Sequence, residues 1–336
     1  MKWFAYLALF AAAACGQDSG PVFRVTSDLV LLDVQVIHNK TNTAAGDLEA
    51  KDFDLAEDGV SQRILFFGRD QLPLSVVLLF DLTQSDRRVL RQMAERARSA
   101  LDHLKPEDEV AVMVYAAGTS LIDGFSSDHA RTAAAIARAA ATKSDDAAFF
   151  NEAMYQSAAQ LEKPANPASR RVILWLTDNL PNFPTNYMVR SHDRGLAGTM
   201  PHTEEEAIRK LHESGTVVMP LLLKDRVLSW MYSLQVALDQ AQFDREHPDN
   251  RDYPPGDAHK YAELTGGFAF TLRGKAVEER LAEAIDTLRG RYTIGYRPAE
   301  ARPPGTFCRV KVALAPSAPL HAQEWSVLVR AGYYRK

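Results

Sequence analysis

Continuous apolar runs that alternate with helix-forming segments constrain the fold of this chain more than any other feature. The runs VVLLF at 76–80 and VILWL at 172–176 consist of aliphatic and aromatic residues. Such continuous apolar runs are typical of strands buried on both faces of a parallel sheet. Between them, residues 88–104 place Leu, Met and Ala on one helical stripe. This alternation predicts an α/β fold: a doubly wound, mainly parallel sheet with helices on both faces.

Both ends of the chain have a different, β-like pattern. Val30, Leu32, Val34 and Val36 alternate with other residues near the N-terminus, and RYTIGYRP, FCRVKVALAP and EWSVLVRAGYY follow near the C-terminus. Because an isolated hairpin is marginal in water, we expect the two ends to pair into one β-sandwich-like module. Two separate small β modules are the alternative.

The predicted domain organisation follows from these patterns. Residues 22–70 form an N-terminal β-rich segment and residues 291–336 a C-terminal one, which pairs with the first. Residues 71–290 form the α/β domain, which is inserted between the two halves of the β module.

The N-terminus predicts export. The apolar run from Trp3 to Ala14 is shorter than the ~20 residues that a membrane-spanning helix needs, but it suits a secretory signal peptide at 1–15. Two outcomes stay open, lipid acylation at Cys15 and ordinary cleavage nearby. We therefore place the mature protein in a bacterial cell envelope or outside the cell. Cys308, the other cysteine, is expected to be a buried strand residue without a disulfide.

The charge of the chain excludes one class of partner. There are 39 Lys and Arg against 43 Asp and Glu, a formal net charge of −4. Binding to nucleic acid relies on clustered positive charge, so we expect no nucleic-acid partner. Contact with a membrane is expected only through a lipid anchor.

Polar side chains gather where the two buried strands end. Asp81 follows the first apolar run, with Thr83 and Ser85 at alternate positions, and Asp178 follows the run VILWLT. Ligands of parallel α/β sheets bind at the carboxyl ends of the strands. Carboxylate and hydroxyl oxygens suit a hard cation such as Mg²⁺. Asp81 and Ser85 also suit a helix cap, and Asp178 suits a turn.

The motif DLTQS at 81–85 and the segment LTDN at 176–179 resemble the metal-ion-dependent adhesion site of von Willebrand factor A (VWA) domains. The family has Asp-x-Ser-x-Ser in the first motif, and an Asp, commonly in Thr-Asp-Gly, after a central strand. Here Thr83 keeps a hydroxyl and Asn179 replaces the frequent Gly. The resemblance implies a VWA/Rossmann-like fold and a site for Mg²⁺, with Mn²⁺ or Ca²⁺ as alternatives. Its ligands would come from Asp81, Thr83, Ser85 and Asp178.

The resemblance extends to the bacterial VWFA-related group of acidobacterial type, over nearly the whole mature chain. Similar segments occur there before the α/β core, near its end and at the C-terminus. They are DFDLAEDGVSQRILFF, LTGGFAFTL, LRGRYTIGYRP and RAGYY. Several separated motifs in the same order are more specific than any one of them.

One ligand of the family's complete site has no counterpart here. In this group a Thr comes from a middle loop, usually within Gly-Gly-Thr before a helix, whereas this chain has KSDDAAFF at 143–150. Either Asp146 or Asp145 supplies the missing oxygen, or the middle ligand is lost. An added carboxylate would neutralise more of the cation's charge and weaken its attraction for an acidic partner.

The resemblance implies an exported, non-enzymatic protein that mediates adhesion or protein–protein binding through the strand-end face. An acidic side chain of the protein ligand would complete the metal site. One alternative is a structural or assembly module of the cell envelope without a functional metal site. The remote alternative is an aspartate-nucleophile phosphotransfer enzyme, which needs an acid two residues after Asp81, where this chain has Thr83.

Overall fold

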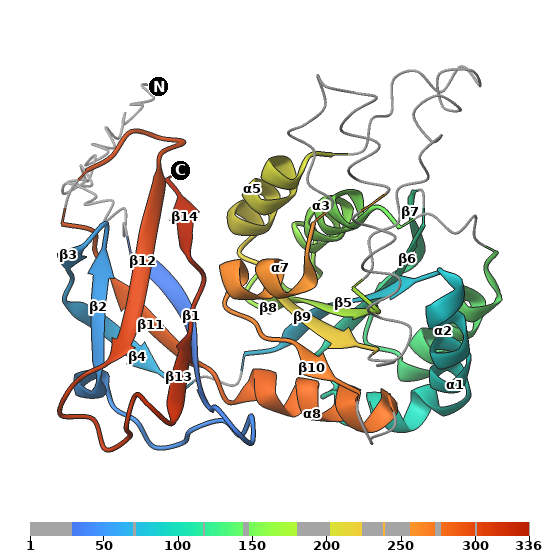
Figure 1. The fold of residues 1–336 in the computed structure, drawn as a ribbon, viewed down its shortest axis with the longest axis horizontal. Helices are drawn as coiled ribbons and strands as arrows, with labels where there is room; N and C mark the ends of the chain where they lie inside the picture. The colour runs from blue at the N-terminus through green and yellow to red at the C-terminus, as the bar shows by residue number, and fades with distance from the viewer. Residues whose placement is uncertain are drawn as a thin grey trace, which may run out of the picture.

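A β-sandwich and an α/β domain lie side by side in the computed structural model of the protein (Figure 1). The structure describes residues 29–69, 72–116, 118–143, 148–179, 202–223, 238, 256–272, 277–299 and 301–335, without the side chains of 84–87 and 97–100. The predicted signal peptide and Cys15 lie outside these residues. Within them, no helix is long and apolar enough to cross a membrane.

The α/β domain is built on one sheet with the order β10-β9-β8-β5-β6-β7. The strands are β5 (Leu74–Asp81), β6 (Glu109–Tyr115), β7 (Thr119–Ser126), β8 (Arg170–Thr177), β9 (Val217–Leu222) and β10 (Phe270–Thr271). All neighbouring pairs are parallel except β6 and β7. Every residue of β5 is buried, because helices cover both faces of this central strand.

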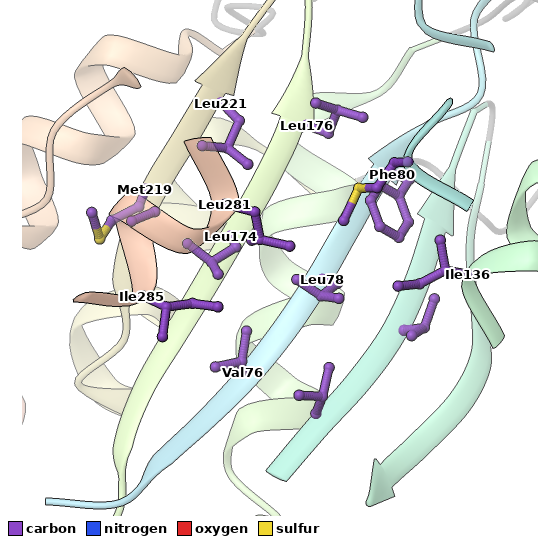
Figure 2. Packing of buried hydrophobic residues seen from close by; sticks show 14 of the residues in the cluster. Val76, Leu78, Phe80, Ile136, Leu174, Leu176, Met219, Leu221, Leu281 and Ile285 are labelled. Carbon is purple, nitrogen blue, oxygen red and sulfur yellow. The ribbon is translucent and has the colours of Figure 1, made fainter. Parts of the chain in front are cut away.

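Two sets of helices cover the sheet. Helices α1 (Gln84–Leu101), α2 (His129–Ala141) and α8 (Val277–Arg289) pack on one face, where Ile136, Leu281 and Ile285 meet alternate residues of the strands (Figure 2). Helices α3 (Phe150–Leu161), α5 (Glu204–Ser214) and α7 (Ala258–Thr265) pack on the other face. Each large apolar side chain buried in these layers contributes about 1.5–3 kcal/mol.

Helix α1 begins closer to β5 than the sequence pattern indicates. The apolar stripe predicts a helix at 88–104, but the helix starts at Gln84. Its first turn is polar, so it adds nothing to the stripe that reveals the rest of the helix. Ser85 therefore belongs to the first turn of α1.

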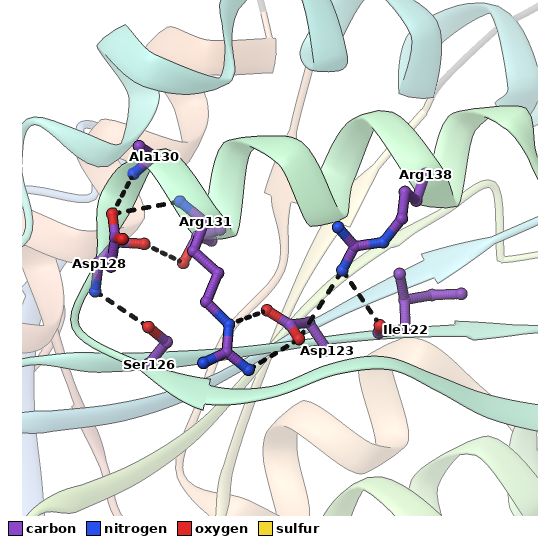
Figure 3. A network of polar contacts seen from close by, with 8 residues as sticks. Ile122, Asp123, Ser126, Asp128, Ala130, Arg131 and Arg138 are labelled. Carbon is purple, nitrogen blue, oxygen red and sulfur yellow. Dashed lines mark hydrogen bonds and ion pairs between the residues drawn. The ribbon is translucent and has the colours of Figure 1, made fainter.

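The antiparallel edge strand β7 is not predicted by the sequence pattern, because its residues are mostly polar or half-exposed. Asp123 on this strand accepts hydrogen bonds from Arg131 Nε (2.7 Å) and Nη2 (2.9 Å), and Arg138 Nη2 lies 3.7 Å away (Figure 3). The hydrogen bonds from Arg131 hold the pKa of Asp123 below its ordinary value. These contacts attach β7 to helix α2, whose first turn is capped by Asp128.

The β-sandwich combines strands from both ends of the chain. One sheet has the order β13-β1-β11-β4 and the other β14-β12-β2-β3. The strands are β1 (Val30–His38), β2 (Phe53–Glu57), β3 (Val60–Ser61), β4 (Ile64–Gly68), β11 (Tyr292–Tyr296), β12 (Phe307–Leu314), β13 (Trp325–Leu328) and β14 (Gly332–Tyr334), with a short 3-10 helix at Ala50–Asp52. Alternate residues of these strands fill the space between the sheets, among them Leu32, Val34, Val36, Phe53, Tyr292 and Cys308. The predicted fold class is thereby confirmed.

Buried polar side chains join the sandwich to the α/β domain. Arg170, at the start of β8, reaches Asp33 of β1, with 2.8 Å between Nε and Oδ1. The fully buried Arg291 lies with Nε 3.3 Å from Asp33 Oδ2 and donates from Nη1 to Gln35 Oε1 at 3.1 Å. Gln35 in turn donates to the carbonyl of Thr287 in α8. Burial lowers the pKa of Arg291 to about 10, which leaves it charged at neutral pH. The two units thus share a charged contact in which both arginines are buried.

Candidate functional site

The parallel register brings four polar side chains to the carboxyl edge of the sheet. Asp81 ends β5 and lies opposite Tyr115, which ends β6. Phe80 pairs with Leu176 of β8, so Thr177 and the half-buried Asp178 follow at the same edge. The site therefore forms where three neighbouring strands end, as expected for a parallel sheet.

Hydrogen bonds from Thr83 and Tyr115 hold the carboxylate of Asp81, whose side chain is fully buried. The backbone N–H of Thr83 donates to Oδ1 at 2.9 Å, and the hydroxyl of Tyr115 donates to Oδ2 at 2.7 Å. Trp175 Nε1 donates to the same hydroxyl at 3.0 Å. The Asp81 carboxylate is thus oriented on one side by its own loop. On the other side it is oriented by an aromatic layer, which consists of Tyr115 and Trp175.

The charged form of Asp81 is unfavourable in the folded protein. Burial and, second, the charge of Asp178 raise the pKa of Asp81 from its ordinary value of 3.8 to about 7. The hydrogen bonds from Thr83 and Tyr115 act in the opposite direction but are weaker. Among the described residues, no Lys, Arg or His forms an ion pair with Asp81. Each of two neighbouring carboxylates disfavours the charged form of the other.

The structure describes only some of the ligands predicted from the sequence. Asp81, Thr83 and Asp178 lie at one edge of the sheet, and Thr83 is buried. The backbone of Ser85 lies in the first turn of α1, whereas its side chain is outside the described part of the structure. Asp145 and Asp146 also lie outside the described residues.

The loop after β8 has Asn179 where the VWA motif that it resembles frequently has Gly. Asn179 has φ 61°, in the left-handed region that Asn tolerates better than most residues with a side chain. Its backbone N–H donates to Thr177 Oγ1 at 3.0 Å. The side chain adds contacts that Gly could not make: Nδ2 donates to Asp257 Oδ2, and Oδ1 accepts from the backbone N–H of Ala258.

The donor set fits a hard cation in its chemistry. Carboxylates of Asp81 and Asp178 with the hydroxyl of Thr83 are oxygen ligands of the kind that Mg²⁺ prefers. A divalent cation would also offset the charge that raises the pKa of Asp81. The residues that the structure describes contain no group of three or more His, Cys, Asp or Glu that could hold a metal. A cation here would therefore depend on hydroxyl and water oxygens.

Tyr115 is the site residue that sequence reasoning missed. It ends the predicted strand EVAVMVY, so the rule that ligands bind at strand ends could have found it. Its hydroxyl donates to Asp81 and accepts from Trp175, and both contacts are buried. Neither partner is near Tyr115 in sequence, which is why composition and spacing do not reveal the network.

Replacing Tyr115 by Phe is expected to lower the free energy of unfolding by about 1–3 kcal/mol, because Asp81 and Trp175 both lose a buried partner. Urea unfolding followed by circular dichroism would measure this loss. The control is Tyr155→Phe on α3, where no hydroxyl contact of this kind exists among the described residues, and a change within about 0.5 kcal/mol is expected. Equal effects of the two substitutions would contradict the assigned role of the Tyr115 hydroxyl.

Comparison with solved structures finds similar folds at low identity. An aerotolerance-related membrane protein from Bacteroides fragilis NCTC 9343 is 12% identical, over 63% of this chain and 98% of that chain, with a TM-score of 0.39. The conserved hypothetical protein BatB from Bacteroides thetaiotaomicron is 13% identical, over 64% and 98%, with a TM-score of 0.39. The SpRpn10 VWA domain is 8% identical, over 64% and 95%, with a TM-score of 0.37. Identities this low say nothing of function.

Comparison by sequence finds no relative. No protein-family model matches the chain, and no curated protein matches it at a significant level. The site is therefore interpreted from its own residues.

Proposed function

We propose that this chain is a non-enzymatic protein-binding module that uses the strand-end face of its α/β domain, with a divalent cation at that face. One observation supports the proposal most. Asp81 is a fully buried carboxylate whose pKa is raised by burial and by Asp178, and no cation among the described residues pairs with it. A protein keeps such an arrangement at a cost to its stability, which is typical of functional sites.

Specific residues would hold the ion. Asp81 and Asp178 would provide charge, and Thr83 and Ser85 would provide hydroxyl oxygens. When bound, the cation offers an incomplete positive charge to an acidic side chain of a partner protein. Mg²⁺ is the proposed ion, and Mn²⁺ and Ca²⁺ are the alternatives to be measured beside it.

The middle ligand is proposed to be Asp146, with Asp145 as the alternative. A third carboxylate would leave less positive charge for the partner, so the site would bind its cation more tightly and its acidic ligand more weakly than a site with Thr. Asp146→Thr should therefore weaken binding of the cation and strengthen binding of the acidic partner.

The setting of the protein is also a proposal. The N-terminal segment 1–15 suits a signal peptide, so we propose that the mature chain works in the cell envelope or outside the cell. A lipid on Cys15 would hold it at a membrane surface, and a soluble secreted form is the alternative.

A second candidate is a structural or assembly module without a working metal site. It is favoured by the lack of a group of three or more acidic, His or Cys residues in the described parts of the chain. In that case the β-sandwich, and not the strand-end face, would contact the neighbouring protein.

Isothermal titration calorimetry separates the two candidates. Titration of Mg²⁺, Mn²⁺ or Ca²⁺ into the metal-free protein is expected to give heat of binding, and Asp81→Ala should abolish it because the central carboxylate is removed. Asp54→Ala, an exposed acid on β2, is the matched control and should bind like the wild type. No heat from the wild type at millimolar ion would rule out metal-dependent binding.

Capture experiments test the partner. A pull-down from an envelope extract should recover a protein that is lost when a chelator is added or when Asp81 is replaced by Ala. Capture that persists under both conditions but fails with substitutions on the β-sandwich surface would favour the structural module. Turnover of a generic phosphatase substrate that Asp81→Asn abolishes would instead favour a phosphotransfer enzyme.

A further inference from the structure

Helix α7 connects the candidate site to the β-sandwich. It begins after its N-cap residue Asp257 and lies on the side of the α/β domain that faces the sandwich (Figure 1). Its eight residues, Ala258–Thr265, span about 12 Å at 1.5 Å per residue. Each of its two ends is attached to a different functional part of the molecule.

The N-terminal end of α7 is attached to the loop that carries Asp178. Asn179 donates from Nδ2 to Asp257 Oδ2 at 3.0 Å and accepts at Oδ1 from the backbone N–H of Ala258 at 2.8 Å. Asp257 is the N-cap of α7, and its other oxygen accepts from the backbone N–H of Lys260. The side chain next to Asp178 is therefore part of the cap of this helix.

The C-terminal end of α7 is attached to the sandwich. The carbonyl of Leu264 accepts from the backbone N–H of Ala331 at 2.9 Å, and the carbonyl of Gly266 accepts from Nη2 of the buried Arg291 at 2.6 Å. Gly266 has φ 75°, and a Cβ there would lie 2.6 Å from the backbone carbon of Val329. The helix end and the strand connection before β14 are thus in direct backbone contact.

Contacts along its length attach α7 to the sheet and to α3. Thr265 Oγ1 accepts from the backbone N–H of Val218 in β9, and the buried Tyr261 donates to Asn151 Oδ1 at the start of α3. Tyr261 also packs against Trp175 of the aromatic layer under Asp81, with ring centroids 6.3 Å apart. A displacement at one end cannot be absorbed by the middle of so short and well-packed a helix.

We propose that α7 is a strut through which the β-sandwich positions the Asp178 loop, so that ion binding at the strand-end site and docking of the sandwich are coupled. Asn179 is then a positioning residue and does not itself bind the ion. The inference rests on the proposed function for its effect on the ion. The connection from Asn179 through α7 to Ala331 depends only on the contacts described above. Coupling between two binding equilibria is reciprocal, so the ion should in turn secure the sandwich contact.

Two substitutions test the strut from opposite ends. Asn179→Gly keeps the left-handed backbone but removes both side-chain contacts with the cap of α7. Gly266→Ala adds a methyl group that the sandwich backbone at Val329 has no room for. The matched control is Gly59→Ala in the β2–β3 turn, which has φ 84° and nothing within 4 Å of the added Cβ. It creates similar backbone strain without contact with α7.

The first measurement is affinity for Mn²⁺ by calorimetry, with thermal unfolding to confirm that each variant is folded. Asn179→Gly and Gly266→Ala are each expected to weaken Mn²⁺ binding about tenfold, the size typical of changes in residues that orient a metal ligand. Gly59→Ala is expected to stay within about twofold of the wild type. Gly266→Ala that is folded and binds like Gly59→Ala would overturn the coupling. If the wild type has no affinity for Mn²⁺, the proposed metal site is wrong. The role of α7 as a strut is then tested by the second measurement alone.

The second measurement is hydrogen exchange at the backbone N–H of Ala331, which reports the far end of α7 without any ion. Asn179→Gly is expected to accelerate this exchange about tenfold, and Gly59→Ala to leave it unchanged. Unchanged exchange at Ala331 in Asn179→Gly would overturn the strut whether or not the site binds metal.

Discussion

Asp81→Asn is expected to stabilise the metal-free protein by about 2–4 kcal/mol at about pH 8. Asn keeps the size and a hydrogen-bond acceptor but removes a charge that is fully buried near Asp178. A substitution that stabilises the fold while removing ion binding is the expected signature of a residue kept for function.

The pH dependence of this effect has a definite sign. The pKa of Asp81 in the folded protein, about 7, lies above its ordinary value of 3.8. Folding is therefore favoured when this carboxyl is protonated. The favourable contribution is complete below about pH 4 and is lost as the pH rises through about 7. The advantage of Asp81→Asn over the wild type should consequently be largest at about pH 8 and shrink towards zero near pH 4.

Urea unfolding of both proteins in chelator at several pH values would measure the difference. Asp108→Asn is the matched control, because Asp108 is also buried but pairs with Arg289 and accepts from the backbone N–H of Leu74 at 2.8 Å. This control should destabilise the protein at about pH 8, the opposite sign. If the wild type is as stable as Asp81→Asn at every pH, the buried charge of Asp81 does not destabilise the fold. With excess Mg²⁺ the wild type should gain stability and Asp81→Asn should not.

Asp33→Asn is expected to destabilise the protein by about 2–4 kcal/mol, because it leaves the buried guanidinium groups of Arg170 and Arg291 without their shared carboxylate. Removal of one partner from a fully buried ion pair typically costs about 3–5 kcal/mol. The side chain of Asp33 keeps 26% of its surface exposed, so solvent reduces the expected cost. Arg170 Nη2 and Arg291 Nε already lack a hydrogen-bond partner, which makes the contact sensitive to any further loss.

Chemical unfolding of Asp33→Asn beside Asp54→Asn would measure this cost. Asp54 is an exposed acid on β2, and its substitution should change stability by no more than about 0.5 kcal/mol. The effect at Asp33 should persist at about 0.5 M salt, because buried charges are screened far less than exposed ones. If the loss is below about 1 kcal/mol or vanishes with salt, the carboxylate does not hold the two units together.

Asp33 and Asp81 have opposite electrostatic surroundings. Asp33 lies between two cations and joins the sandwich to the α/β domain, whereas Asp81 lies near the carboxylate of Asp178. Both are acids on buried strands in the sequence, and nothing in their immediate neighbours distinguishes them. The difference arises from which distant side chains the fold brings to each.

Elements with strong local patterns could be predicted from the sequence. The apolar runs that form β5 and β8 and the stripe of α1 each depend on residues close together along the chain. Strand β7 and the polar first turn of α1 escaped prediction because their positions depend on the sheet and not on an apolar pattern.

The candidate site divides in the same way. Local apolar patterns were enough to place Asp81 and Asp178 at the ends of buried strands, with Thr83 as a further oxygen, because strand ends can be recognised from such patterns. The folded chain was needed to show that Tyr115 donates to Asp81, that Asn179 belongs to the cap of α7 and that this helix continues to the sandwich. Each of these contacts joins residues more than thirty positions apart, and strand register and packing, which no local pattern encodes, bring them together.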